Sequence, residues 1–255
     1  DNGVSWERAS TGLACTSVRA LAINPTGHIF AATNVGVFRT TNNGTNWSAV
    51  NSGLTSTDVY CVTITPKGAV LIGTDKGTNP GIFRSADGSG NWSQVLQYSI
   101  VFTFTLGPNG NLYAGGYNGP VHLSTDDGIS WTPQGAKTGV WIHCLYVNPS
   151  GTLYAGTDGI FRSTDAGKSW TSSYKGLACT DVVGFSTLRG GIVIAGTGGS
   201  RLHRSTDNGA TWTEAKISSD WLPAITTVTS GQDGIAYAGT YNGEILRTTD
   251  KGVTW

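Results

Sequence analysis

An octet that begins with serine or threonine and ends with tryptophan recurs along the whole chain of 255 residues. The full copies share a hydroxyl residue, an acidic or amide residue two positions later and a terminal tryptophan: Thr40–Trp47, Ser85–Trp92, Ser124–Trp131, Ser163–Trp170, Ser205–Trp212 and Thr248–Trp255. A shortened copy, Asp1–Trp6, opens the sequence, and successive octet tryptophans are 39 to 45 residues apart. A fixed period of this length is typical of repeat architectures, in which each repeat forms one small structural unit.

The octet has the chemistry of a turn that satisfies its own backbone. A hydroxyl and a carboxylate two residues apart can bond to N–H groups of their own loop, and the glycine can take a positive φ. The tryptophan adds a large apolar surface that can hold the turn against a sheet. Asn42 replaces the aspartate in one copy, and Ser89 stands at the glycine position of another. We assign structural roles to Asp87, Asp126, Asp165, Asp207, Asp250, Trp47, Trp92, Trp131, Trp170 and Trp212.

Three strand-like runs precede each octet, and a fourth run follows its tryptophan. In the first repeat these runs are residues 18–24, 28–33, 36–40 and 47–50. Short apolar and β-branched runs between Gly, Pro and Asn turns predict antiparallel strands. Four such strands per repeat make one blade of a β-propeller. The sequence therefore predicts an all-β fold, a single β-propeller domain over residues 1–255 with six blades of four antiparallel strands.

The two ends of the chain indicate how such a ring would close. Residues 6–10 look like the fourth strand of a blade, and the last repeat stops at Trp255 without its fourth strand. We expect the N-terminal strand to complete the last blade, which would remove exposed sheet edges. Seven blades, or a fragment of a longer array, are the alternatives. Because the first and last octets are redundant and the chain contains no methionine, we also expect it to be part of a larger protein.

The pattern Ser/Thr-x-Asp-x-Gly-x-x-Trp resembles the Asp-box, or BNR repeat, of sialidases, sortilin-type receptors, xyloglucanases and photosystem II assembly factors. The resemblance covers essentially the whole chain, and the regular spacing of its copies makes it specific. It implies a β-propeller. It implies no single activity, because enzymes, receptors and scaffolds share the box.

Charge and hydropathy argue against two classes of partner. Sixteen basic residues balance sixteen acidic ones, and only 13% of the chain is charged. A neutral chain without a basic cluster offers no footprint for nucleic acid or an anionic membrane, so we expect neither partner. Its apolar runs are far shorter than the roughly 20 residues that span a bilayer. Low charge and three Asn-x-Ser/Thr sites, at Asn43, Asn46 and Asn91, favour a secreted, cell-surface or periplasmic location.

Cysteine and histidine spacing does not indicate a metal site, and we expect no cofactor. No Cys-x-x-Cys or His-x-x-x-His occurs. Four cysteines are present, and Cys15 with Cys179, like Cys61 with Cys144, occupies equivalent positions of different repeats. Such positions are too distant for a disulfide, so free thiols that pack as small core residues are expected. Of the four histidines only His143 is a candidate for chemistry, and the sequence assigns it no carboxylate partner.

The candidate ligand-binding residues lie where first strands begin and in turns on the same edge. Aligning the repeats places Arg19, Tyr60, Phe102, His143 and Val183 at one position, where the repeats have diverged. In a propeller the first strand borders the central channel, and its leading loop lies on the face opposite the octets. Aromatic residues and aspartates in these loops and in the second turns complete the set. The candidates are Arg19, Tyr60, Phe102, Trp141, His143, Trp221, Tyr117, Tyr241, Asp58 and Asp181.

Exposed aromatic rings beside Asn and Asp suit contact with a sugar ring or a partner loop. The sequence therefore favours a binding or interaction module with a glycan or protein ligand on the channel face. The competing interpretation is that Trp141 and Trp221 merely cover the channel mouth.

The alternative function is a glycoside hydrolase, sialidase- or xyloglucanase-like, which the resemblance implies. Sialidases of this type use three arginines, but five arginines here belong to a repeated structural signature: Arg39, Arg84, Arg162, Arg204 and Arg247. A xyloglucanase-like site needs two aspartates facing each other across a cleft, and a pair among Asp58, Asp181 and Asp220 is the candidate. We assign no catalytic residue.

Overall fold

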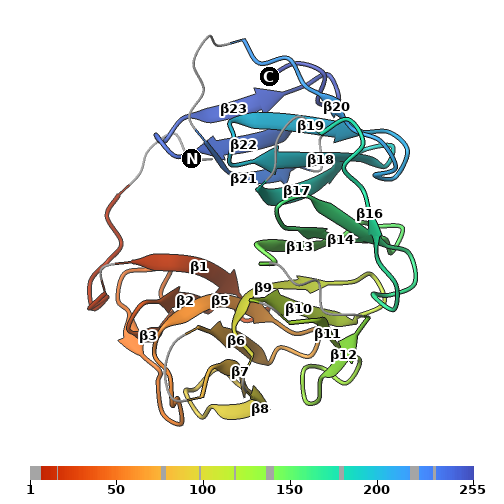
Figure 1. Cartoon of the computed structure of the whole chain (residues 1–255). Helices are drawn as coiled ribbons and strands as arrows, with labels where there is room; N and C mark the ends of the chain where they lie inside the picture. Colours follow the sequence, from red (N-terminus) through yellow and green to blue (C-terminus); the bar gives the residue numbers. More distant parts are fainter. Residues whose placement is uncertain are drawn as a thin grey trace. The chain divides into compact units, whose positions relative to one another are not determined.

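The computed structural model describes residues 7–15, 17–75, 79–97, 99–117, 119–135, 141–177, 181–218, 224–231 and 234–255. Regular structure in this part of the chain consists of β-strands (Figure 1). The chain divides into two compact units. The first comprises Asp1–Val101 with Asp126–Ser130, and the second comprises Phe102–Thr125 with Trp131–Trp255.

The first unit contains two four-stranded antiparallel sheets, with the strands of each sheet in sequence order. The first sheet consists of β1 (Val18–Ile23), β2 (Ile29–Thr33), β3 (Gly36–Thr40) and β4 (Ser48–Ala49). The second consists of β5 (Val59–Ile64), β6 (Val70–Thr74), β7 (Gly81–Ser85) and β8 (Ser93–Gln97).

Four further antiparallel sheets follow along the chain. The third consists of β9 (Val101–Leu106), whose first residue belongs to the first unit, β10 (Leu112–Gly116), β11 (Val121–Ser124) and β12 (Thr132–Gln134). The fourth consists of β13 (Cys144–Val147), β14 (Leu153–Gly156), β15 (Ile160–Ser163) and β16 (Thr171–Ser172). The fifth consists of β17 (Val182–Leu188), β18 (Ile192–Thr197), β19 (Arg201–Ser205) and β20 (Thr213–Glu214). The sixth has three strands, β21 (Ile225–Ser230), β22 (Ala236–Thr240) and β23 (Ile245–Thr248).

These sheets confirm the predicted all-β fold with one blade per repeat and three strands in the last. The strand bounds follow the predicted runs closely. β1 ends one residue before the predicted end, because the Asn24 side chain accepts the backbone N–H groups of Thr26 and His28 at 3.2 and 2.9 Å. This side chain closes the first turn and stops the strand.

The hydrophobic core lies between neighbouring sheets within each unit. In the second unit Leu145 and Val147 of β13 pack with Tyr113 and Val121 of the preceding sheet. β1 differs, because its residues Val18 and Leu21 are 46% and 62% exposed, whereas the equivalent residues Val59 and Val62 of β5 are buried. The burial of apolar surface between sheets, worth about 25 cal/mol per Å², is the main stabilising contribution of this arrangement.

The octets form the predicted self-bonded turns. In Ser163–Trp170 the Ser163 hydroxyl donates to Asp165 Oδ1 at 2.8 Å and accepts the Gly167 N–H. Asp165 then accepts the Ser169 N–H at 2.9 Å and the Ser169 hydroxyl at 2.6 Å. The same hydrogen bonds recur in Ser205–Trp212 and Thr248–Trp255. Because these bonds favour the carboxylate, the pKa values of Asp165, Asp207 and Asp250 fall to about 2.

Two consecutive left-handed residues, rather than the glycine alone, make five of the six full octets turn sharply. The residue before the glycine has φ between 54° and 65° in these octets, at Asn43, Asp127, Ala166, Asn208 and Lys251. In Ser85–Trp92 a glycine, Gly88, occupies that position with φ 66°. This explains how the octet tolerates Ser89: the left-handed glycines there are Gly88 and Gly90, on either side of it.

The repeated arginine of the third strand is structural, as predicted, because it bonds to the octet of the next repeat. The guanidinium of Arg162 donates to the carbonyl of Asn208 at 2.9 Å, and that of Arg39 to the carbonyl of Gly88 at 3.2 Å. Arg84 and Arg204 donate to the equivalent carbonyls of Asp127 and Lys251. Each of these arginines therefore joins two neighbouring blades.

Three of the octet tryptophans also make hydrogen bonds between neighbouring repeats. The indole of Trp92 donates to the carbonyl of Val50 at 2.6 Å, and that of Trp212 to the carbonyl of Ser173 at 2.8 Å. Trp47 donates in the same way to Ala9, at 2.9 Å. Residues 7–10 carry no strand assignment but meet the first blade as fourth-strand segments meet the others. Asp1–Trp6 lie outside the described residues, so ring closure, like the single-domain assignment, stays a prediction.

Candidate functional site

The candidate residues meet in pairs across neighbouring repeats. We call the aligned position of Arg19, Phe102 and His143 the strand position. The lead position is two residues before the strand position in each repeat; Asp58, Trp141 and Asp181 occupy it. The strand position of one repeat meets the lead position of the next in three cases: Arg19 with Asp58, Phe102 with Trp141, and His143 with Asp181. The repeat therefore presents one constant geometry that carries three different chemistries.

The pair in the third and fourth repeats is aromatic and belongs to a larger cluster. The rings of Phe102 and Trp141 stack with centroids 5.8 Å apart and an angle of 26°. Tyr117, in the turn between β10 and β11, meets Trp141 edge to face at 4.9 Å and 73°. We call these three residues the aromatic cluster. Trp141 is 52% exposed and Tyr117 44%, so the cluster presents apolar ring surface to solvent.

The pair in the fourth and fifth repeats places polar groups beside the aromatic cluster. His143 Nε2 lies 3.6 Å from Asp181 Oδ1, an ion pair when the imidazole is protonated. The His143 ring lies 6.3 Å from the Trp141 ring, centroid to centroid. Asp181 is held in the left-handed region, with φ 67°, and its carbonyl accepts the Gly198 N–H at 2.9 Å. An imidazole thus lies beside an exposed indole, and a carboxylate lies beside that imidazole.

The pair in the first and second repeats is a close ion pair within the protein. Arg19 Nη1 lies 2.6 Å from Asp58 Oδ1 and donates to the carbonyl of Val59 at 3.2 Å. The same guanidinium lies 3.8 Å from the centroid of the Tyr60 ring. We call Arg19, Asp58 and Tyr60 the arginine cluster. Because the charge is paired and the ring face is covered, this cluster is poorly suited to bind a ligand.

Two candidates lie outside both clusters and outside the His143–Asp181 pair. Tyr241, in the turn between β22 and β23, is 81% exposed and makes no ring contact with another described residue. Trp221 lies outside the described residues. The sequence did not identify Asp181 as the partner of His143. The strand position of one repeat meets the lead position of the next, and this offset of one repeat would have paired the two residues.

The described residues hold free thiols and no evident metal centre. Cys15, Cys61 and Cys144 are free, and Cys179 lies outside the described residues. The Cys61 thiol donates to the carbonyl of Val101 and the Cys144 thiol to that of Val182. Burial raises the pKa of Cys144 to about 12 and that of Cys61 further, so both thiols stay protonated. Within the described ranges no group of three or more His, Cys, Asp or Glu side chains could hold a metal ion.

Comparisons of the sequence give one relative. No family model matches the chain. A xyloglucanase from Hypocrea jecorina (strain QM6a) is 35% identical over 133 residues, a match that covers 48% of this chain. The matched part spans only 16% of the xyloglucanase.

Solved structures give a broader likeness. Virginiamycin B lyase from Staphylococcus aureus matches with a TM-score of 0.74 and 18% identity over 91% of this chain and 84% of the lyase. An ancestral GH74 enzyme matches with a TM-score of 0.74 and 16% identity over 94% of this chain and 39% of the enzyme. YCF48 bound to a D1 peptide matches with a TM-score of 0.71 and 18% identity over 97% of this chain and 84% of YCF48.

The structural likeness extends over nearly the whole chain. Because the sequence identity is low, this likeness shows the fold alone. No helix that could cross a bilayer occurs in the described part of the chain. With six antiparallel sheets in sequence order and these neighbours, the chain has a β-propeller fold.

Proposed function

We propose that the chain is a carbohydrate-binding β-propeller module and that the aromatic cluster takes a sugar ring. The observation that carries the proposal is the exposed indole of Trp141, which Phe102 and Tyr117 hold in place from two sides. An indole ring offers apolar surface to the C–H groups of a sugar, and nearby polar side chains can bind its hydroxyls. His143 and Asp181 supply those polar groups.

The comparisons support a surface that recognises a polymer, without choosing among polymers. One relative is named for xyloglucan and one structural neighbour was solved with a D1 peptide. We favour a glycan over a peptide, because the flat rings of the cluster lie beside the His143 imidazole and its carboxylate partner. A secreted or surface location would suit this role, and the Asp-box assignment of the octets is part of the same proposal.

The test is binding of xyloglucan oligosaccharides, measured by isothermal titration calorimetry on the protein and on Trp141→Ala. Saturable binding that the variant loses supports the proposal. Tyr241→Ala is the matched control, since it also removes an exposed aromatic ring but lies outside the cluster. The proposal is contradicted if Trp141→Ala still binds the oligosaccharide, or if the parent protein binds no neutral glycan. Binding of an extended peptide in place of glycans would show that the site recognises protein ligands.

Glycoside hydrolysis is the second candidate, favoured by the xyloglucanase match. Two-carboxylate glycosidases need a pair roughly 5 to 10 Å apart. Of the predicted carboxylates, Asp58 is paired with Arg19, Asp181 lies beside His143, and Asp220 lies outside the described residues. Release of reducing ends from xyloglucan, lost in Asp181→Asn, would establish the enzyme; oligosaccharide binding without release would establish a binding module.

A further inference from the structure

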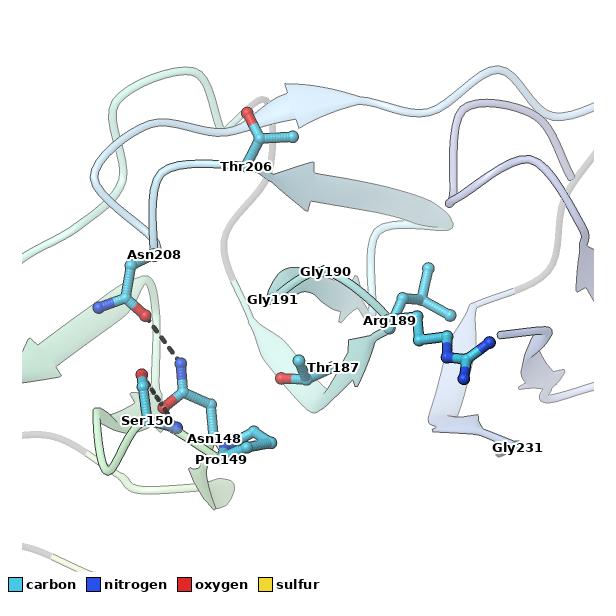
Figure 2. A pocket seen from close by; sticks show the side chains of 11 residues that line it. Asn148, Pro149, Ser150, Thr187, Arg189, Gly190, Gly191, Thr206, Asn208 and Gly231 are labelled. Atoms are coloured by element: carbon cyan, nitrogen blue, oxygen red, sulfur yellow. Dashed lines mark hydrogen bonds between the residues drawn. The ribbon is translucent and has the colours of Figure 1, made fainter. Parts of the chain in front are cut away.

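A second candidate site lies at the other end of the first strands from the lead positions. It is a cavity of about 680 Å³, within the range of roughly 300–1,000 Å³ that small-molecule sites occupy. The turn between β13 and β14 (148–150) and the turn between β17 and β18 (187–191) form its walls, with Thr206, Asn208 and Gly231 (Figure 2). We call it the turn cavity.

The turn between β17 and β18 departs from the repeat. The first four repeats have proline at its second position, as in Asn148-Pro149-Ser150-Gly151, whereas the fifth reads Leu188-Arg189-Gly190-Gly191. Gly190 and Gly191 are both left-handed, with φ 86° and 77°. A Cβ atom at either glycine would meet nothing within 4 Å, so the space over this turn is open. The departure therefore adds a cation and removes side-chain bulk at the same place.

Arg189 is the one charged group among the described residues that line the turn cavity. Its side chain is exposed, and no described residue accepts a hydrogen bond from its guanidinium. A guanidinium stays charged at any physiological pH and matches a carboxylate with two parallel N–H groups. With no lining carboxylate to oppose it, the cavity favours an anionic group at its Arg189 end.

The opposite wall is polar, uncharged and fixed in place. Asn208 Oδ1 accepts the hydroxyl of buried Tyr154 at 2.8 Å and the Asn148 Nδ2 group at 2.7 Å, and Asn208 Nδ2 donates to the Thr152 hydroxyl. Figure 2 shows Asn148, Ser150 and Asn208 on one side of the Gly190–Gly191 turn and Arg189 on the other. A ligand that crosses the glycine turn would meet a cation at one end and amide and hydroxyl groups at the other.

We propose that the turn cavity binds a carboxylate-bearing sugar, that is, a uronic acid unit. The carboxylate pairs with Arg189, and the sugar hydroxyls bond to the exposed side chains of Ser150 and Thr206. The exposed ring of Pro149 provides an apolar part of the lining. This site shares no residue with the aromatic cluster, so its test is independent of the test of the proposed function.

The test is a titration of the ¹⁵N-labelled protein with D-glucuronate, D-glucose and acetate, monitored by NMR at the amides of Gly190 and Gly191. We expect glucuronate to bind in the millimolar range and at least about tenfold more tightly than glucose or acetate. Arg189→Gln should weaken glucuronate binding at least about tenfold, since it removes a charge-assisted pair. Ser150→Phe should also weaken it by filling the cavity at an exposed turn residue.

Two controls separate this site from general effects. Lys168→Gln removes an exposed cation of another octet turn, and Trp141→Ala disables the aromatic cluster; both should leave glucuronate affinity unchanged. Arg189→Lys checks folding and should retain part of the affinity. The proposal is overturned if glucose or acetate binds as tightly as glucuronate, or if Arg189→Gln or Ser150→Phe binds it like the parent.

Discussion

The arginine cluster and the aromatic cluster share the strand and lead positions of the repeat but differ in chemical character. In the first, Arg19 is engaged by Asp58, by the Val59 carbonyl and by the Tyr60 ring. In the second, Phe102 and Tyr117 cover parts of Trp141 and leave 52% of it exposed. Half of the roughly 250 Å² of a tryptophan, at about 25 cal/mol per Å², is worth about 3 kcal/mol if a ligand buries it. One blade geometry therefore gives either a closed polar contact or an open apolar one, according to the residues at two positions.

Removing the indole should have the largest effect. Trp141→Ala is expected to weaken oligosaccharide binding by about 10- to 100-fold, because central aromatic anchors carry most of the energy of such contacts. Tyr60→Ala, in the arginine cluster, should change affinity less than about twofold. Titration calorimetry on both variants checks the contrast. Comparable losses in the two variants would mean that both clusters contact the ligand.

The second contrast concerns stability. Asp58→Asn should lower the free energy of unfolding by about 1–2 kcal/mol, since it leaves the largely buried Arg19 charge without its carboxylate. Asp181→Asn should cost less than about 0.5 kcal/mol, because the Asp181 side chain is 56% exposed. Urea denaturation of the two variants measures both values. Equal costs would show that the two pairs do not differ in the way described above.

A smaller effect is expected at the edge of the aromatic cluster. His143→Gln keeps a hydrogen-bonding group near Asp181 but loses the imidazole, so we expect roughly two- to fivefold weaker oligosaccharide binding with unchanged stability. Calorimetric titration and a thermal melt of the same sample test this. A loss as large as that of Trp141→Ala would make His143 the principal contact instead of the indole.

Mild acid should leave intact the octet turns that contain Asp165, Asp207 and Asp250. The octet carboxylates of Asp165, Asp207 and Asp250 have pKa values of about 2, below the roughly 3.9 of an unfolded aspartate. Their contribution to stability is present above pH 4 and is lost as the pH falls from about 4 to about 2. Circular dichroism melts should change little from these groups between pH 7 and pH 4. In Asp165→Asn the acid-dependent loss should be smaller; an identical acid transition would contradict the role given to this carboxylate.

The fold could be predicted almost completely, because the same octet recurs in every repeat and predicts the same turn each time. The Ser163–Asp165–Ser169 hydrogen bonds follow from residue types at fixed spacing, and Arg162 is recognisable as structural because it recurs at one place. Individual members of the site were also recognisable, since Trp141 and Phe102 stand where the repeats diverge.

What the sequence left open was which divergent residues meet. That depends on the offset of one repeat between strand and lead positions, which is a property of how neighbouring blades pack. The same limit applies to the turn cavity. Arg189 could be placed in a turn from the sequence, but its distance in sequence from Asn148 and Thr206 conceals the cavity that they share.

Binding at the aromatic cluster is tested most directly by the tryptophan indole resonances in a ¹H–¹⁵N NMR titration with a xyloglucan oligosaccharide. The exposed Trp141 indole should shift in a saturable manner. The indoles of Trp92 and Trp212, which donate to the carbonyls of Val50 and Ser173, should stay in place and serve as internal references. A Trp141 resonance that does not move while the oligosaccharide binds, or shifts confined to other tryptophans, would contradict the assignment of the aromatic cluster as the binding site.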